Sequence, residues 1–274
     1  MDTLELFDPA EIRRVLCIVA HPDDMEYGGS AAVAEWTSRG IEVSYLLLTA
    51  GEAGIRDRDP AEVGPLRADE QRAARGKLTI FFGACAGVGK TFAMLQALRQ
   101  QREAGCEGLV GIVETHGRQE TARLLEGLPM LPSRRVAYRG HDLAEFDLDA
   151  VLALHPPLIV VDELAHSNVE GSRHRKRWQD VAELLAAGID VYTALNVQHL
   201  ESLNDIVAGI TGIPVRETVP DRVFDEADEV RLVDLPPDEL LSRLAAGKVY
   251  LPDAAERARQ HFFRKGNLIA LREL

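Results

Sequence analysis

Short apolar runs alternate with amphipathic stretches along almost the whole chain. The first runs predict one βαβ unit, with strand, helix and strand at 15–20, 31–40 and 42–50. A segment rich in glycine, proline and aspartate follows at 51–65, and we expect a short charged helix at 66–75. The alternation then restarts at Gly76, so we divide the chain into a domain at 1–75 and a domain at 76–274.

The second domain continues the alternation of strands and helices. The pattern predicts strands at 78–82, 108–113, 134–139, 158–162, 189–195 and 229–235. It predicts helices at 90–103, 118–127, 148–155, 177–188, 199–210 and 236–247, and a further helical stretch at 252–274. Such alternation is typical of a parallel sheet with helices on both faces. We therefore predict an α/β fold, with a doubly wound, mainly parallel sheet at 76 to about 250, preceded by a partial Rossmann-like βαβ unit.

Composition and charge narrow the functional classes. The net charge is −13, and a general nucleic-acid binder would need a basic surface, so we expect no nucleic-acid partner. The apolar runs have strand length, below the roughly 18 residues of a spanning helix, so we expect no membrane span. The first residues lack a signal-peptide core, and the three cysteines are widely spaced, so we expect a cytoplasmic location.

A glycine-rich turn, "FFGACAGVGKT", follows the first strand of the second domain. Glycines in such a turn let successive N–H groups point inward, and the helix that follows adds its positive end. Lys90 would reach the outer phosphates of a nucleotide, and the Thr91 hydroxyl would ligate Mg²⁺. Ala84 stands where the commoner pattern has glycine, and the turn also fits a packing role alone. As a phosphate loop, it would bind through Gly87, Val88, Gly89, Lys90 and Thr91.

An acidic pair ends the buried run "LIVVDE". Open α/β sheets bind ligands at the carboxyl ends of their strands. Asp162 would therefore hold the shell of the Mg²⁺ ion, and Glu163 would polarise a water molecule, which makes Glu163 our candidate catalytic residue. Asp162 also fits a helix N-cap or a solvated strand end. The turn and the acidic pair together favour a P-loop NTPase-like domain.

Further polar residues follow strand ends and are candidates for the same crevice, although each singly also fits a cap or a surface position: Arg118, Asn196, Gln198 and His199. The stretch "GSRHRKR" at 171–177 concentrates cations at a predicted helix start. The helix dipole disfavours cations there unless an anion or a partner compensates them. A solvated loop is the alternative interpretation.

Long runs of the second domain resemble one family closely. They are "GKLTIFFGACAGVGKTFAMLQ", "GIVETHGRQET", "YRGHDLAEFDLDA", "LIVVDELAHSNVEGSRHRKRWQDVAELLAAGIDVYTALNVQHLESLNDIV", "RETVPDRV" and "FFRKGNLIALREL". They resemble the cytoplasmic N-terminal domain of the KdpD potassium-responsive sensor histidine kinases over nearly all of 76–274.

The resemblance implies an ATP-binding regulatory domain that tunes the kinase and phosphatase activities controlling a potassium-uptake operon. ATP and Mg²⁺ are the implied cofactors, with Asp162 as the second motif. The implied partners are other histidine kinase domains or a response-regulator system. Family members are anchored in the inner membrane and continue into a kinase core that this chain does not include, so we expect no self-phosphorylation. Slow ATP hydrolysis through Glu163 is an open possibility, with Arg118 as a guess for an arginine finger.

The first domain carries a different candidate site, in "AHPDDMEYGGS". A histidine and two carboxylates at a strand end make a partial metal site, with one aspartate as a base, but they also fit a turn with aspartate caps. The run through "LLLTAGEAG", with the later "RADEQRAA", is similar to the opening of PIG-L (LmbE-like) zinc-dependent N-acetylglucosaminyl deacetylases. The resemblance implies His21 and Asp24 as zinc ligands and Asp23 as the general base.

The resemblance to the deacetylases stops near Ala74. That family takes its third ligand, another histidine, from a later motif, and here His141 and His155 stand in a different motif context. We therefore expect an incomplete zinc site, no resident zinc and no deacetylase activity, and the zinc deacetylase remains the alternative function. A lone βαβ unit also lacks strands against which to pack, so we predict a poorly supported N-terminal segment.

Overall fold

The computed structural model describes residues 14–19, 32–33, 36–37, 41–47, 75–115, 117–138, 141–249 and 262–274. The chain divides into two compact units, Met1–Ala74 and Arg75–Leu274. In the first unit, strands β1 (Arg14–Val19) and β2 (Glu42–Leu47) pair in parallel. They match the two strands predicted there, and short helical stretches at 32–33 and 36–37 lie between them in sequence. Residues 66–74 of the helix predicted at 66–75 lie outside the described residues, and Arg75 forms a bend.

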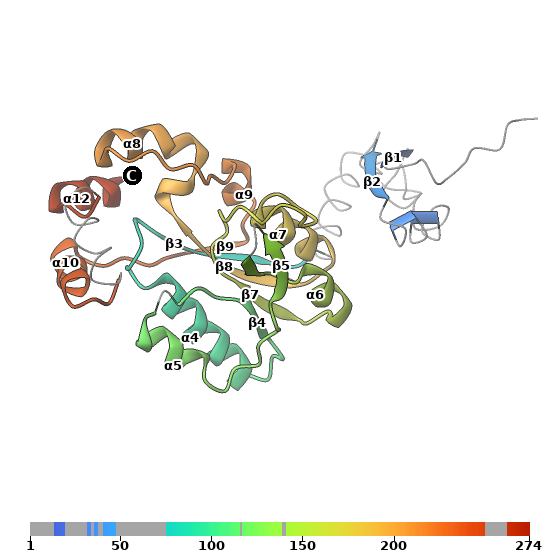
Figure 1. Cartoon of the computed structure of the whole chain (residues 1–274), viewed down its shortest axis with the longest axis horizontal. Helices are drawn as coiled ribbons and strands as arrows, with labels where there is room; N and C mark the ends of the chain where they lie inside the picture. The colour runs from blue at the N-terminus through green and yellow to red at the C-terminus, as the bar shows by residue number, and fades with distance from the viewer. Residues whose placement is uncertain are drawn as a thin grey trace, which may run out of the picture. The chain divides into compact units, whose positions relative to one another are not determined.

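The second unit is built on a five-stranded sheet (Figure 1). Its strands, in spatial order, are β4 (Leu109–Ile112), β7 (Leu158–Val161), β8 (Asp190–Asn196), β3 (Leu78–Gly83) and β9 (Glu229–Leu232). Every neighbouring pair in this sheet is parallel. The predicted α/β class and the mainly parallel sheet are therefore confirmed.

Alternating side chains of the central strands pack on opposite faces of this sheet, because successive Cβ atoms of a strand point to opposite sides. Phe81 of β3 packs in a cluster with Leu95 of helix α4 (Lys90–Glu103). Ile80, its neighbour, packs with Leu184 of helix α7 (Arg177–Ala186). Helix α5 (Gln119–Leu125) contacts α4, and α6 (Leu148–Leu154) contacts α7, so helices cover both faces (Figure 1).

One predicted strand does not join the sheet. Strand β5 (Arg134–Tyr138) pairs antiparallel with β6 (His141–Glu145) in a separate two-stranded sheet. Our prediction of a further parallel strand at 134–139 was therefore wrong. Tyr138 pairs with His141 only three residues later, whereas a parallel neighbour needs a crossover of a dozen or more residues.

The helix expected from 199 starts later than predicted. Two short 3₁₀ helices, η2 (Val197–His199) and η3 (Glu201–Leu203), precede α8 (Asn204–Thr211). The backbone of this segment is engaged elsewhere, because Glu201 N donates to Val219 O (3.1 Å) and Val219 N donates to His199 O (2.7 Å). These bonds replace the helical bonds that an earlier start would require.

Helices of the C-terminal part close over the loop that follows β3. They are α10 (Pro237–Ala245) and α12 (Lys265–Glu273), and α12 contacts both α8 and α10 (Figure 1). Cys85 and Val88 of that loop are buried in one apolar cluster with Leu240 of α10 and Leu268 of α12. Helix α9 (Asp221–Asp225) instead packs against the cluster on the sheet, where Phe224 contacts Phe82. The predicted helical stretch at 252–274 is present in its last part as α12, and residues 250–261 lie outside the described part.

None of the helices in the described part of the chain is both long enough and apolar enough to cross a membrane.

Candidate functional site

The glycine-rich turn lies between β3 and α4, and α4 begins at Lys90. Gly87 and Gly89 have φ angles of 91° and 104°, in the left-handed region that residues with a Cβ rarely adopt. A Cβ on Gly87 would also lie 2.6 Å from Val249 Cγ1. The turn therefore needs glycine at these positions, and it leads directly into the first N–H groups of α4, which have no partners within the helix.

Lys90 is buried beneath this turn, with 9 % of its surface exposed. Its Nζ donates to the Cys85 backbone carbonyl at 3.0 Å and to the side-chain oxygen of Asn196, at the end of β8. Burial lowers the pKa of the Lys90 ammonium to about 8, because desolvation disfavours the charged form. The ammonium is thus held at the loop by neutral oxygen atoms, and a bound anion would raise its pKa again.

The Asp162 carboxylate, after β7, lies beside the start of α4. Its Oδ2 accepts a hydrogen bond from Thr91 Oγ1 (3.1 Å) and one from Glu114 N (3.4 Å), and its Oδ1 accepts from Glu163 N (2.9 Å). Burial raises the pKa of Asp162, and the neighbouring Glu163 charge adds to the rise. The N-cap interpretation does not hold, since the next α-helix begins only at Arg177.

Glu163 adopts an unusual backbone conformation, with a φ of 57°. Residues other than glycine, asparagine and aspartate seldom adopt the left-handed region, and those that do are concentrated at functional sites. The conformation turns the chain sharply after Asp162, and Glu163 lines the same cavity as Lys90 and Thr91.

This cavity has a volume of about 250 Å³ and collects residues from four strand ends. Around it lie most of the candidate residues named from the sequence: Gly87, Gly89, Lys90, Thr91, Arg118, Asp162, Glu163, Asn196, Gln198 and His199. Val88 instead packs in the apolar cluster beneath the loop. His199 Nδ1 donates to the Glu217 backbone carbonyl at 2.7 Å, and burial lowers the pKa of His199.

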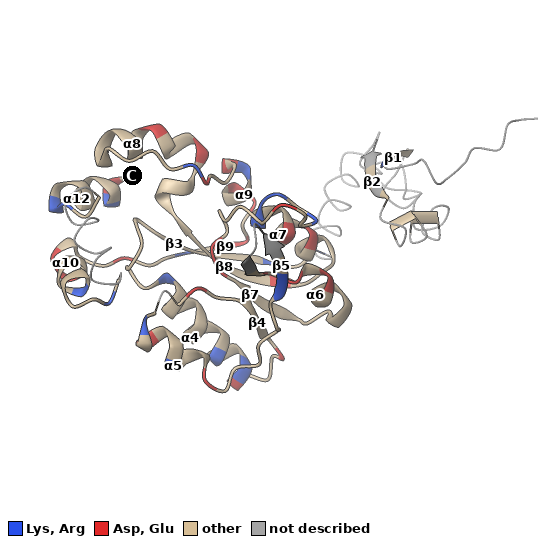
Figure 2. Cartoon of the chain, viewed as in Figure 1, with Lys and Arg blue, Asp and Glu red and all other residues tan. Residues whose placement is uncertain are grey.

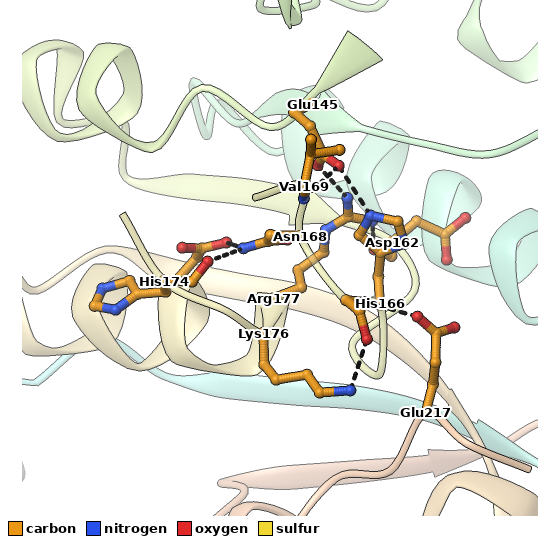
Figure 3. Close-up of polar contacts among 11 residues, drawn as sticks. Glu145, Asp162, His166, Asn168, Val169, His174, Lys176, Arg177 and Glu217 are labelled. Atoms are coloured by element: carbon orange, nitrogen blue, oxygen red, sulfur yellow. Dashed lines mark hydrogen bonds and ion pairs between the residues drawn. The ribbon is translucent and has the colours of Figure 1, made fainter. Parts of the chain in front are cut away.

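His166 and Glu217 also line the cavity, and sequence reasoning missed both. His166 comes three residues after Glu163, within the turn that follows β7. The hydrogen bond from Ser167 N to Glu217 Oε1 (2.8 Å) joins the two segments (Figure 3). The position of His166 after a strand end was a usable signal, whereas nothing in the sequence around Glu217 marks it.

A buried ion pair supports the strand end that carries Asp162 (Figure 3). Arg177, only 2 % exposed, donates from Nη1 to the Asp162 carbonyl (3.1 Å) and from Nη2 to Glu145 Oε2 (3.3 Å). Glu145 Oε1 contacts His166 Nε2 and accepts from Val169 N, both at 3.2 Å. Burial alone would raise the pKa of Glu145, but the His166 contact and Arg177 outweigh it, and the pKa is lowered.

The cationic stretch before α7 is compensated by the chain's own acidic residues (Figure 2). Arg173 forms ion pairs with Asp149 and Glu183, and His174 Nε2 lies 2.7 Å from Glu183 Oε2. Lys176 donates to Ser167 Oγ at 2.7 Å (Figure 3). The chain therefore supplies the compensating charges at this helix start.

The residues of the predicted zinc site, His21, Asp23 and Asp24, lie outside the described residues. His155 ends α6 with a φ of 49°, and its Nε2 lies 2.7 Å from the Ala187 carbonyl. His141 opens strand β6. Both histidines thus belong to the second unit, as their motif context indicated.

Comparison with protein families gives two matches. The model described as the osmosensitive K⁺ channel His kinase sensor domain, KdpD, matches residues 74–274. The model described as GlcNAc-PI de-N-acetylase, PIG-L, matches residues 16–130. Both resemblances inferred from the sequence are confirmed, and the first covers far more of the chain.

The individual relatives likewise match the chain over more residues in the KdpD family than among the deacetylases. The chain is 65 % identical over 220 residues to the sensor protein KdpD of Escherichia coli K12, which covers 80 % of this chain and 25 % of that protein. It is 54 % identical over 206 residues to the sensor protein KdpD of Clostridium acetobutylicum, covering 75 % and 23 %. A diacetylchitobiose deacetylase of Thermococcus kodakarensis is 38 % identical over 64 residues, covering 23 % and 24 %. The chain thus spans about a quarter of the length of these relatives.

Proposed function

The chain belongs to the KdpD family of osmosensitive K⁺ channel His kinase sensor domains, and we propose that its Arg75–Leu274 unit binds Mg²⁺-ATP. The two KdpD relatives described above are named sensor proteins, and the chain spans about a quarter of each. We infer that nucleotide binding here regulates a potassium-responsive, two-component histidine kinase. Partners in that role are the other kinase domains and a response regulator. In this proposal the unit works in the cytoplasm, as part of a longer protein anchored in the inner membrane.

The observation that carries the proposal is the buried Lys90 ammonium beneath a left-handed glycine turn. A buried ammonium whose partners are neutral oxygen atoms is costly, and phosphate oxygens would offset that cost. Gly89 has open space where a Cβ would stand and so leaves room for a phosphate close to the backbone, and the α4 N-terminus favours negative charge. The donor set therefore fits a phosphate chain, and we propose a P-loop NTPase-like domain with a Walker A motif in its Ala84 form.

The Thr91 hydroxyl and the Asp162 carboxylate fit the Mg²⁺ ion that accompanies ATP. They lie 3.1 Å apart, and Mg²⁺ prefers hard oxygen ligands while keeping several waters and substrate phosphates. Asp162 would hold the ion through its water shell, and Thr91 would contact it directly. The bound ion would neutralise the buried carboxylate, whose pKa is raised by its surroundings.

Calorimetric titration of Mg²⁺-ATP into the full chain tests the proposal, with the variants Lys90→Ala and Lys77→Ala. We expect saturable binding that is lost in Lys90→Ala, since the terminal phosphates lose their cation. Lys77 is exposed and lines neither cavity described here, so Lys77→Ala is the matched control and should bind as the parent does. Circular dichroism checks the folding of each protein. Undiminished binding by Lys90→Ala, or no binding by the parent, would refute the proposal.

Proton uptake gives an independent signature of the same site. The pKa of Lys90 is lowered to about 8, and phosphate would raise it again. Binding near pH 8 should therefore take up a fraction of a proton, seen as a dependence of the heat on buffer ionisation enthalpy. A heat of binding to the parent that is the same in all buffers near pH 8 would contradict this signature.

Slow ATP hydrolysis is a second candidate activity, favoured by the strained Glu163 beside the cavity. Glu163 would polarise a water, and Arg118, which lines the same cavity, would act on the developing charge. Steady phosphate release that Glu163→Gln abolishes would support this activity. Equal release by the parent and this variant would remove Glu163 from it.

For the N-terminal unit we propose no deacetylase function. The relative that is a deacetylase matches only 64 residues, and the family's third zinc ligand comes from a later motif. Metal analysis after purification with zinc should find no stoichiometric metal. One zinc per chain, lost in His21→Ala, would overturn this view.

A further inference from the structure

A second cavity, of about 330 Å³, adjoins the phosphate loop. Gly87, Gly89 and Arg118 line both this cavity and the first one. The other walls come from the first turn of α4, the start of α5, and the end of α10 with the turn that follows it. A ligand that wraps the loop can therefore extend from one cavity into the other.

The two cavities differ in chemistry. The first contains Lys90 and the Thr91–Asp162 pair, which suit terminal phosphates and a metal ion. In the second, three cationic side chains, Arg118, Arg243 and Lys248, line the cavity with a single carboxylate, Glu120. Local positive charge in a chain of net charge −13 favours an anionic group, here the inner phosphate of a nucleotide.

The half-exposed Glu120 carboxylate lies between two of these cations. Its Oε1 lies 2.6 Å from Lys248 Nζ, and its Oε2 lies 3.5 Å from Arg243 Nη2. A carboxylate beside a phosphate site is a suitable acceptor for ribose hydroxyls. Phe92 and Ala246 add apolar surface of the kind that a nucleobase contacts.

We propose that the second cavity holds the nucleoside part of the nucleotide, with Glu120 accepting from the ribose hydroxyls. This inference rests on the proposed function, since it requires that the phosphates bind at Lys90. Arg243 and Lys248 then lie on the side of the inner phosphate, and the base lies against Phe92 and Ala246.

The test compares Mg²⁺-ATP with Mg²⁺-tripolyphosphate on the full chain, because the second probe has no nucleoside. Ala246→Trp places a bulky side chain at an exposed position that lines the second cavity. We expect it to weaken ATP binding by about tenfold or more while leaving tripolyphosphate within about twofold. Ala245→Trp is the matched control, since Ala245 is exposed and is not among the residues that line either cavity. It should change neither affinity.

Glu120→Gln gives a second, milder variant. The parent should bind ATP more tightly than 2′,3′-dideoxy-ATP, and Glu120→Gln should reduce that preference. Its tripolyphosphate affinity should not fall, because Arg243 and Lys248 lose a carboxylate partner and keep their charges. Should Ala246→Trp fail to fold, this comparison alone decides.

Two results would overturn the inference while the proposed function stands: unchanged ATP affinity in Ala246→Trp, or equal losses of ATP and tripolyphosphate. In both cases ATP binding that Lys90→Ala abolishes would remain. If the parent binds neither probe, the proposed function fails, and the inference fails with it.

Discussion

Two buried carboxylates of the second unit lie in contrasting surroundings. Asp162 and Glu145 are 2 % and 4 % exposed, and both are linked to Arg177, Asp162 through its backbone carbonyl and Glu145 through its carboxylate. The hydrogen bonds to the Asp162 carboxylate come from a hydroxyl and two backbone amides, and its pKa is raised. Glu145 has an arginine and a histidine, and its pKa is lowered.

The difference distinguishes a carboxylate that stabilises the fold from one that is available to a ligand. A buried carboxylate with a paired cation is electrostatically satisfied and holds segments together. A buried carboxylate without that compensation lowers stability and is often retained for a ligand. In our proposal the ligand of Asp162 is Mg²⁺, whereas Glu145 fixes the β5–β6 hairpin to the strand end that carries Asp162.

The largest effect on stability is expected from breaking the ion pair between Arg177 and Glu145. Arg177→Met leaves the Glu145 carboxylate buried without its arginine and should lower the free energy of unfolding by about 3–5 kcal/mol. Chemical denaturation followed by circular dichroism measures this loss. The double variant Glu145→Gln with Arg177→Met should recover part of it, because the neutral amide can still accept from Val169 N. A single-variant loss below about 1 kcal/mol would show that the pair does not hold the hairpin.

Asp162, which has no ion pair in the described part of the chain, should behave in the opposite way. Asp162→Asn removes a buried charge while the amide can still accept from Glu163 N and face the Thr91 hydroxyl. We expect unfolding free energy within about 1 kcal/mol of the parent, and Mg²⁺-ATP affinity reduced about tenfold, or about 1.4 kcal/mol. Chemical denaturation measures the unfolding free energy, and calorimetric titration measures the affinity. Strong destabilisation with unchanged affinity would reverse the roles assigned to Asp162 and Glu145.

The dependence of stability on pH sharpens the same contrast. Asp162 binds its proton more tightly in the folded state, so its contribution is unfavourable above the unfolded pKa of about 3.9. The stability of the parent relative to Asp162→Asn should therefore rise as pH falls through the raised pKa. Glu145, with a lowered pKa, contributes stability that is present above about pH 4.3 and lost on further acidification. Denaturation of the parent and of the single variants Asp162→Asn and Glu145→Gln at several pH values measures both effects. The stability difference from the parent should change with pH in opposite directions for the two variants.

Sequence reasoning reached Asp162 but missed Glu145, and the reason is physical. Asp162 ends an apolar run, and the carboxyl ends of parallel strands meet at one edge of a sheet, so its position follows from local pattern. Glu145 depends on a contact with Arg177, 32 residues later, and on a hairpin that we took for a parallel strand. The runs on either side of Arg139 and Gly140 were a usable hairpin signal. No signal in the sequence marks the burial of Arg177, which lies within a cationic stretch.

A third carboxylate, Glu183, shows how burial changes the contribution of an ion pair to stability. Like Glu145 it has one arginine and one histidine, Arg173 and His174, but these groups are much less buried, with Arg173 46 %, Glu183 32 % and His174 29 % exposed. Solvent and salt screen such pairs, and holding long side chains in place costs entropy. Glu183→Gln should therefore lower the unfolding free energy by less than about 1 kcal/mol, and the loss should shrink in high salt.

His174 gives this last prediction a pH signature. The hydrogen bond to Glu183 raises the pKa of His174, so its contribution is present below the unfolded pKa of about 6.5 and is lost as pH rises through the folded pKa. The small difference between the parent and Glu183→Gln should accordingly fade above neutral pH. A loss as large as that of Arg177→Met, insensitive to salt, would mean that partner type rather than burial sets the strength of these pairs. The contrast between Glu145 and Asp162 would then no longer distinguish a structural carboxylate from one kept for a ligand.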